Sequence, residues 1–169
     1  ISDDSSITRD THHLLLLGRD DPVKGHQFAI ELTQELRKIH PQARLTLTGV
    51  DQNKYEWVDA RGWVSEIEKI NLLQKATVLL VPSLFEGQPL AALEALFANC
   101  PVIASDTVHS LPSTVLTAEF GNVASWLKVY QSLLPINGVE SAQSFTVKHI
   151  QSRWNEYYSN ILSSNNLVE

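Results

Sequence analysis

Short apolar runs alternate along this chain with longer segments in which apolar residues recur at helical spacing. Residues 13–17 form a continuous apolar run that ends at Gly18, which predicts a strand buried on both faces. Residues 27–39 repeat apolar side chains at helical spacing until Pro41 ends the pattern. Further strands are expected at 44–48, 57–64, 77–81, 101–104 and 115–117, and further helices beginning at Ser65 and over 89–98, 122–134 and 147–161.

This alternation predicts an α/β fold, in which a single doubly wound, Rossmann-like domain has a mostly parallel sheet covered by helices on both faces. The domain is expected to span residues 13–162, between a flexible N-terminal segment at 1–12 and a flexible tail at 163–169. Ser65 is expected to cap its helix, with Glu68 as the partner of a capping box, and Asn122 to cap the helix that follows it.

Composition narrows the class of protein and its compartment. A formal charge of −6 argues against a nucleic-acid-binding surface, and no apolar run reaches the length of a membrane-spanning helix. The single cysteine, Cys100, excludes an internal disulfide, fits a reducing compartment and is expected to be a buried core thiol. Because the chain begins at Ile1 and contains no methionine, we expect it to be a piece of a longer protein.

Two glutamates mark the most informative segment of the chain. Glu86 follows an expected strand, and Glu94 lies within the expected helix that comes next. The N-terminus of such a helix carries free N–H groups and a positive dipole end, which suit a phosphate. Carboxylates bind phosphate poorly, but they accept hydrogen bonds from sugar hydroxyls. The combination indicates a ligand with both parts, namely a nucleotide-sugar.

Two cationic side chains are expected at the same edge of the sheet. Arg19 and Lys24 follow the first strand, and from one loop both can reach the same diphosphate. Residues 62–64 follow the third expected strand. Ligands of open parallel sheets bind beyond the carboxyl ends of the strands, so these groups and the loop of Glu86 are expected to meet at one site.

Six segments together carry a family resemblance: residues 14–19 with Lys24 and Gly25, then 43–49, 61–64, 76–95, 101–106, and the helix expected from 145. In these segments, and in this order, the chain resembles the C-terminal, donor-binding domain of retaining GT-B glycosyltransferases. That group includes glycogen and sucrose-phosphate synthases. The resemblance covers residues 13–162 and implies that the chain is the C-terminal half of a GT-B fold, without its N-terminal acceptor domain.

The resemblance also implies a role for each matching residue. Arg19, Lys24 and Glu86 would form the catalytic set, because the two cations would hold the diphosphate and Glu86 would bind hydroxyls of the transferred sugar. Glu94 would hydrogen-bond the ribose. The rest of the donor site would be lined by Gly18, by Trp63 and Val64 near the base, and by Gly87, Gln88, Pro89 and Leu90 beside the sugar and phosphate.

The implied activity is transfer of a hexose from a UDP-, GDP- or ADP-sugar to an acceptor with retention of configuration, in polysaccharide or glycoconjugate biosynthesis. Prepositioned cations would do the work of a metal, so no metal and no cofactor are expected. The partners would be the nucleotide-sugar and the absent N-terminal domain. The expected compartment is the cytoplasm, with the inner face of the membrane as an option through that domain. Alone, this domain is expected to bind donor weakly and to turn nothing over.

Four departures from the family pattern stand out. Residues 50–56 are too few for the helix that usually separates the second and third strands, which leaves the place of the third strand open. Pro89 stands where the family has a glycine, and residues 107–110 replace a Gly-Gly pair with a bulkier loop. A hairpin is nearly deleted between residues 113 and 121.

Other interpretations of the same residues stay open at this point. Taken alone, the two glutamates and two cations could be ordinary surface charges, and Trp63 could pack against the edge of the sheet. A non-catalytic nucleotide-sugar-binding module that lost its chemistry through the altered loops is one alternative function. A nucleotide-sugar epimerase domain is another, although the glutamate pair and the Arg/Lys loop disfavour it.

Overall fold

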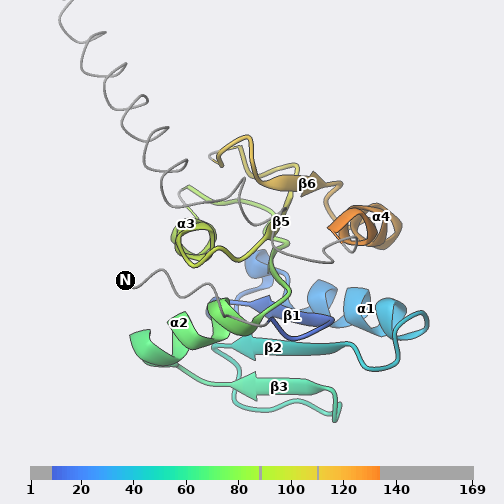
Figure 1. Ribbon diagram of the computed structural model, residues 1–169, viewed down its shortest axis with the longest axis vertical. Coiled ribbons are helices and arrows are strands. Elements are labelled where there is room, and N and C mark those ends of the chain that lie inside the picture. Colours follow the sequence, from blue (N-terminus) through green and yellow to red (C-terminus); the bar gives the residue numbers. More distant parts are fainter. Residues whose placement is uncertain (1–8, 88, 110, 134–169) are drawn as a thin grey trace, which may run out of the picture.

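A computed structural model describes residues 9–133 of this chain, apart from 88 and 110. Within them, six parallel strands form one sheet in the order β3-β2-β1-β4-β5-β6 (Figure 1). The strands are β1 (His13–Leu16), β2 (Arg44–Thr48), β3 (Val58–Arg61), β4 (Val78–Val81), β5 (Val102–Ser105) and β6 (Leu116–Ala118). The helices are η1 (Pro22–Lys24), α1 (His26–Arg37), α2 (Glu66–Lys75), α3 (Leu90–Phe97) and α4 (Val123–Leu133).

Helices cover both faces of the sheet, as Figure 1 shows, with α1 and α4 on one side and α2 and α3 on the other. Successive side chains of a strand point to opposite faces, so each strand feeds two cores. In β1, Leu14 and Leu16 pack into the core under α1 and α4, whereas Leu15 packs under α2 and α3. Because both faces are buried, the central strands are apolar except for His13 at the start of β1, and the doubly wound α/β expectation is confirmed.

The connection between β2 and β3 contains no helix, yet the two strands pair in parallel, with Leu45 opposite Val58. Aromatic side chains of this connection cover the sheet face that a crossover helix would otherwise bury. Tyr55 stacks on Trp57 with ring centroids 4.9 Å apart, the guanidinium of Arg37 lies 5.5 Å from the Trp57 ring, and both rings pack against the α1-side core. The third strand is therefore placed at the edge, and it is shorter than the 57–64 expected.

Helix ends follow the expected capping chemistry. Ser65 and Glu68 form the reciprocal capping box at the start of α2. The Asn122 side chain accepts a hydrogen bond from the Ser125 amide, 3.1 Å away, at the start of α4. Asn99, just after α3, has φ of +55°, a left-handed conformation that asparagine tolerates better than most residues.

The expectation of a flexible segment over residues 1–12 does not hold for residues 9–12, which belong to the fold. The Arg9 guanidinium donates hydrogen bonds to the carbonyls of Leu73, Gln74, Ala76 and Ala98, at the carboxyl ends of α2 and α3. The Asp10 amide also donates to the Lys75 carbonyl, 2.9 Å away. The expectations for residues 1–8, for the final helix at 147–161 and for the tail at 163–169 lie outside the described residues.

Cys100 lies just before β5 and is buried, which confirms the expectation of a core thiol. Burial raises the pKa of this thiol to about 11. It therefore stays protonated near neutral pH, which suits a packing role and not that of a nucleophile.

Candidate functional site

The order in which successive strands are added to the sheet reverses between β1 and β4, although all the strands are parallel. From β1 the chain builds outward through β2 to β3, and from β4 it builds the opposite way through β5 to β6. At such a switch point the loops that follow the two central strands diverge and leave a crevice at their carboxyl ends, where ligands bind. The loop after β1 carries Arg19 and Lys24, and the loop after β4 carries Glu86. The cations and the acid predicted from the sequence therefore flank this point.

Lys24 and Glu86 meet across the crevice. The Lys24 Nζ lies 2.6 Å from Glu86 Oε1, and the Ser83 hydroxyl donates to the same oxygen from 2.7 Å. The Glu86 side chain is only 12% exposed, so the ion pair is largely withdrawn from water. Ser83 was not predicted as a site residue, although its place three residues before Glu86 in a tight loop is the signal that could have identified it.

Two glycines allow the loops at the crevice to approach one another. Gly25 has φ of +76°, and a Cβ there would lie 2.7 Å from the backbone oxygen of Pro82, in the loop after β4. Gly49 has φ of +73°, and a Cβ there would lie 2.3 Å from the carbonyl oxygen of Gly18. The Thr48 hydroxyl also accepts a hydrogen bond from the Gly18 amide, 2.9 Å away. The backbone thus fixes the loop that holds Gly18, Arg19 and Lys24.

Arg19 lies in the same loop but does not join the Lys24–Glu86 pair. Its guanidinium nitrogen is 3.2 Å from Asp21 Oδ2, and its side chain is 69% exposed. The amide of Val23 and then the charge of Arg19 lower the pKa of Asp21. Arg19 is therefore an exposed cation of the loop after β1, paired locally with Asp21.

Glu94 projects from α3 toward α2, where it meets a partner that the sequence did not predict. The Lys69 Nζ lies 2.8 Å from Glu94 Oε1 and also 2.8 Å from Glu66 Oε2. Hydrogen bonds to Glu66 and Glu94 raise the pKa of Lys69. No local sequence signal identifies Lys69, because the contact depends on how two helices pack side by side.

Three of the large apolar residues in the predicted donor-site segments are exposed. Trp63 is 85% exposed, Phe85 70% and Leu90 61%, so the interpretation of Trp63 as a residue packed on the sheet edge is wrong. Its neighbour Val64 instead packs partly against the core under α2 and α3.

The rest of the predicted site lies on the loop that enters α3. Gly87 faces open space, since a Cβ there would meet no atom within 4 Å. Pro89 is buried and directly precedes α3, which suits its lack of an N–H. Gln88 lies outside the described residues.

The loop after β5, which is bulkier than the family pattern, braces the site. The Thr107 hydroxyl donates to the Ser83 carbonyl, 3.1 Å away, and so holds the loop of Glu86 from the other side. Asp106 accepts a hydrogen bond from the Phe120 amide at 3.0 Å, while its own amide donates to the Ala118 carbonyl. Asp106 therefore orders its turn.

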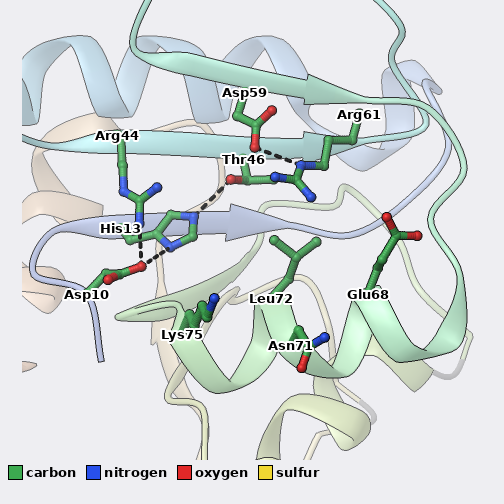
Figure 2. Close-up of a pocket in the computed structure, with 10 residues that line it drawn as sticks. All are labelled: Asp10, His13, Arg44, Thr46, Asp59, Arg61, Glu68, Asn71, Leu72 and Lys75. Carbon is green, nitrogen blue, oxygen red and sulfur yellow. Dashed lines mark hydrogen bonds and ion pairs between the residues drawn. The ribbon is translucent and has the colours of Figure 1, made fainter. Parts of the chain in front are cut away.

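A separate pocket of about 320 Å³ lies between α2 and the strands β1–β3 (Figure 2). Ten residues line it, none of them a predicted donor-site residue: Asp10, His13, Arg44, Thr46, Asp59, Arg61, Glu68, Asn71, Leu72 and Lys75. Its Arg and Asp side chains neutralise one another, because Arg44 pairs with Asp10, and Arg61 with Asp59 at 2.7 Å.

His13, at the start of β1, is the buried group of this pocket. Its Nε2 lies 2.9 Å from the Thr46 hydroxyl, and its side chain is 3% exposed. Burial, and then the charge of Arg44, lowers the pKa of His13 to about 4, so the imidazole is neutral at pH 7.

Among the residues that the structure describes, no three His, Cys, Asp or Glu side chains gather in a way that could hold a metal ion. None of their helices combines the length and apolar character needed to cross a membrane.

The parallel sheet with helices on both faces defines a doubly wound α/β domain, and the comparison with known families is specific. The family model for "Glycosyl transferases group 1" matches residues 11–129, well over half of the chain. The chain belongs to this glycosyltransferase family, which confirms the resemblance found in the sequence.

Two curated relatives illustrate the range of the family. Glycogen synthase of Mycobacterium tuberculosis is 32% identical over 120 residues, which cover 64% of this chain and 29% of that enzyme. D-inositol 3-phosphate glycosyltransferase of Pseudarthrobacter chlorophenolicus is 25% identical over 176 residues, which cover 89% of this chain and 41% of that enzyme. The chain thus spans less than half the length of these relatives.

Solved structures agree on the fold, and these neighbours are GT-B glycosyltransferases. Sucrose-phosphate synthase from Thermosynechococcus elongatus superposes with a TM-score of 0.63 at 22% identity, covering 90% of this chain and 46% of that one. A TarM variant from S. aureus, solved with fondaparinux, α-GlcNAc-glycerol and UDP, gives a TM-score of 0.64 at 19% identity, covering 79% and 30%. At these identities the likeness shows the fold alone.

Proposed function

We propose that this chain is the donor-binding domain of a glycosyltransferase that moves a sugar from a nucleotide-sugar to an acceptor, with retention of configuration and without a metal. The relatives are about two to three times as long as the matched part, so the acceptor site would lie in a second domain of the whole protein. The cytoplasm, or the inner face of the membrane through that second domain, is proposed as its place.

One observation carries the proposal: the Lys24–Glu86 ion pair at the switch point of the sheet. A cation and an acid from loops 62 positions apart are brought within 2.6 Å at the place where doubly wound sheets bind nucleotides. As a glycosidic bond to a diphosphate breaks, negative charge develops on the diphosphate. A cation held in place beforehand by protein groups stabilises that charge with little reorganisation.

The remaining roles are those that the family resemblance implies for the matching residues. Lys24 and Arg19, from the loop after β1, would hold the diphosphate, and Glu86 would accept hydrogen bonds from the transferred sugar. Glu94, further along α3, would accept hydrogen bonds from the ribose. Trp63, which is exposed, would face the base, and the backbone at Gly87, Gln88 and Leu90 would meet the phosphate and sugar.

Family membership favours a transferase over an epimerase, but it does not by itself separate an active enzyme from a module that only binds. The Lys24–Glu86 ion pair supports an active enzyme, because the charge of Lys24 would matter most while the glycosidic bond breaks. UDP, GDP and ADP are the nucleotides to compare. A solved TarM structure contains UDP, so UDP is titrated first.

The experiment is a titration of this chain with UDP, GDP and ADP, followed by amide resonances and calorimetry. A half-site without its second wall should bind weakly, with a Kd of about 0.1–1 mM, or roughly −4 to −5.5 kcal/mol. The amides of Arg19, Lys24 and Leu90 should shift, and added salt should weaken binding. If millimolar nucleotide leaves these three resonances unmoved, the proposed donor domain is wrong.

A further inference from the structure

We propose that Lys69 is a positioning residue that fixes the carboxylate of Glu94 for the ribose hydroxyls, and that it thereby sets the preference of this domain for ribonucleotides over 2′-deoxyribonucleotides. The inference rests on the proposed function, because it takes Glu94 as the ribose-binding residue. It goes further by naming a group on a different helix, outside the loops that carry the donor-site motifs, as the origin of one element of specificity.

The contact joins two neighbouring helices on one face of the sheet. Lys69 lies in α2 and Glu94 in α3, and both helices pack over the same core. The Lys69 Nζ is 2.8 Å from Glu94 Oε1, a distance typical of a charge-assisted hydrogen bond. The Lys69 side chain is 18% exposed, less than half the exposure of Glu94, so its stem is held by packing while its ammonium reaches the acid.

A second acid anchors the ammonium from its own helix. Glu66, one turn earlier in α2, lies 2.8 Å from the Lys69 Nζ. An ammonium has three donors, so it can serve Glu66 and Glu94 together. Lys69 is thus fixed at one side by its helix and presents a set direction to Glu94, and hydrogen bonds to both acids favour its charged form.

The consequence for ribose follows from the geometry of a carboxylate. Its two oxygens offer about four acceptor positions, and Lys69 occupies one position on Oε1. This bond restrains Oε1 and limits the rotamers of the Glu94 side chain, while Oε2 stays available to accept a hydroxyl. Fixing a flexible acid before binding removes the conformational cost of ordering it when the ligand arrives. The gain should appear chiefly for ligands that carry both ribose hydroxyls.

A purely structural role would give a different result. Exposed ion pairs contribute little to stability, and loss of such a pair would not distinguish two ligands that differ by one hydroxyl. The measurement is therefore the ratio of Kd values for a 2′-deoxynucleoside diphosphate and the matching ribonucleoside diphosphate. UDP, GDP and ADP and their 2′-deoxy forms are titrated into this chain, and the pair that contains the tightest binder is used throughout.

Four chains are compared under the same conditions. They are the wild type, Lys69→Met, Lys69→Arg and the control Lys75→Ala. Methionine keeps the length of the stem and the helix propensity but removes the charge. Arginine keeps a charged donor. Lys75 lies in the last turn of α2 and lines the separate pocket. Its replacement by alanine changes the net charge by the same amount as Lys69→Met.

We expect the wild type to prefer the ribonucleotide about tenfold or more, as loss of one hydrogen bond to a charged group predicts. Lys69→Met should reduce that ratio about threefold or more, while Lys69→Arg and Lys75→Ala should keep it within twofold of the wild type. Thermal unfolding of each chain checks that the fold is intact. If Lys69→Met does not fold, Glu66→Ala, which removes the anchor alone, takes its place with the same expected direction.

The two proposals fail in distinguishable ways. If no nucleotide binds, the proposed function fails, and the role of Lys69 fails with it. If nucleotides bind but Glu94→Ala leaves the wild-type ratio unchanged, the ribose role of Glu94 and the positioning role of Lys69 are wrong, while the donor domain stands. If Glu94→Ala removes the preference but folded Lys69→Met keeps it, the donor domain stands and the positioning role of Lys69 is overturned. An equal fall in Lys75→Ala would also overturn it, because net charge would then explain the effect.

Discussion

The crevice between β1 and β4 and the pocket beside β3 are both rich in charged side chains, yet their charges are partnered differently. In the crevice, Lys24 and Glu86 come from loops that the topology brings together, and Glu86 is largely buried. In the pocket, Arg61 pairs with Asp59 two residues away on the same strand, and both side chains are substantially exposed. The pocket encloses about 320 Å³, whereas the crevice holds the largely buried ion pair and lies at the switch point of the sheet.

This contrast teaches that an enclosed volume is a weaker sign of function than a costly arrangement of charge. Burying an ion pair removes two charges from water, and such a pair adds little net stability. An ion pair between exposed strand residues has little desolvation cost, so its presence is weak evidence of a functional site. We therefore expect crevice residues to affect ligand binding and turnover, and pocket residues to affect stability alone.

The largest effect is expected from Lys24 in the full-length protein. Lys24→Ala should lower kcat by roughly 10²–10³, far more than it weakens donor binding, because the diphosphate charge rises as the bond breaks. Steady-state kinetics with a nucleotide-sugar measures both quantities, and Lys75→Ala at the pocket is the control, with unchanged kcat.

The same kinetics tests the absence of a metal requirement. Addition of EDTA should have little effect on the wild type, because Lys24 and Arg19 already supply positive charge. Near-normal kcat in Lys24→Ala would contradict the mechanism. So would a wild-type activity that EDTA abolishes and Mg²⁺ or Mn²⁺ restores.

The next effect belongs to the pocket and concerns stability. The pKa of His13 is lowered to about 4 in the fold, whereas an exposed histidine titrates near 6.5. Protonation thus favours the unfolded chain, so this contribution is fully present above about pH 6.5 and is lost as the pH falls toward 4. The free energy of unfolding should fall by about 2–3 kcal/mol across that window from this residue.

Urea unfolding of the wild type and of His13→Gln between pH 7 and pH 4 measures this contribution. The variant lacks the titrating imidazole, so its stability should depend less steeply on pH. Parallel pH profiles for the two chains would show that His13 does not couple protonation to folding.

A third prediction separates the two acids of the donor site. Glu94→Ala should weaken nucleoside diphosphate binding by about 1–3 kcal/mol, because it removes a charged partner of the ribose. Glu86→Ala should spare the plain nucleoside diphosphate and weaken only the sugar-bearing donor. Calorimetry with both ligands on both variants decides the matter, and equal losses in all four titrations would contradict separate roles.

The smallest effect is expected from the Arg61–Asp59 pair. Arg61→Ala should change the free energy of unfolding by less than about 1 kcal/mol, since exposed pairs contribute little. Nucleoside diphosphate affinity should be unchanged within error. A marked loss of affinity in this variant would show that the pocket takes part in donor binding and would remove the contrast between the two regions.

Much of the fold could be predicted because local patterns and packing agree. Apolar runs such as residues 78–81 are readable as strands buried on both faces, and the Ser65 capping box marks the start of α2 without reference to the rest of the molecule. The place of β3 could not be predicted, because it depends on Tyr55 and Trp57 covering the sheet in place of a helix. Two aromatic side chains take the place of a helix through tertiary packing, and the spacing of apolar residues along the sequence does not predict this.

The site divides in the same way. The approach of Lys24 to Glu86 follows from strand order together with the rule that carboxyl ends share an edge, so the sequence sufficed. The contact of Lys69 with Glu94 depends on the distance and rotation between two helices. Arg19 could be placed in the right loop but not given its partner, because Asp21 competes for an exposed, flexible side chain.

The helix-free connection between β2 and β3 has a consequence for how the domain assembles. Leu45 pairs with Val58 through a short loop, whereas Leu14 of β1 pairs with Val78 of β4 only after most of the intervening chain has been positioned. Closing a longer loop costs more conformational entropy, and non-local pairings slow folding. The β2–β3 edge is thus expected to form early. The seam between β1 and β4 is expected to close late, so that the loops bearing Lys24 and Glu86 meet among the last steps of folding.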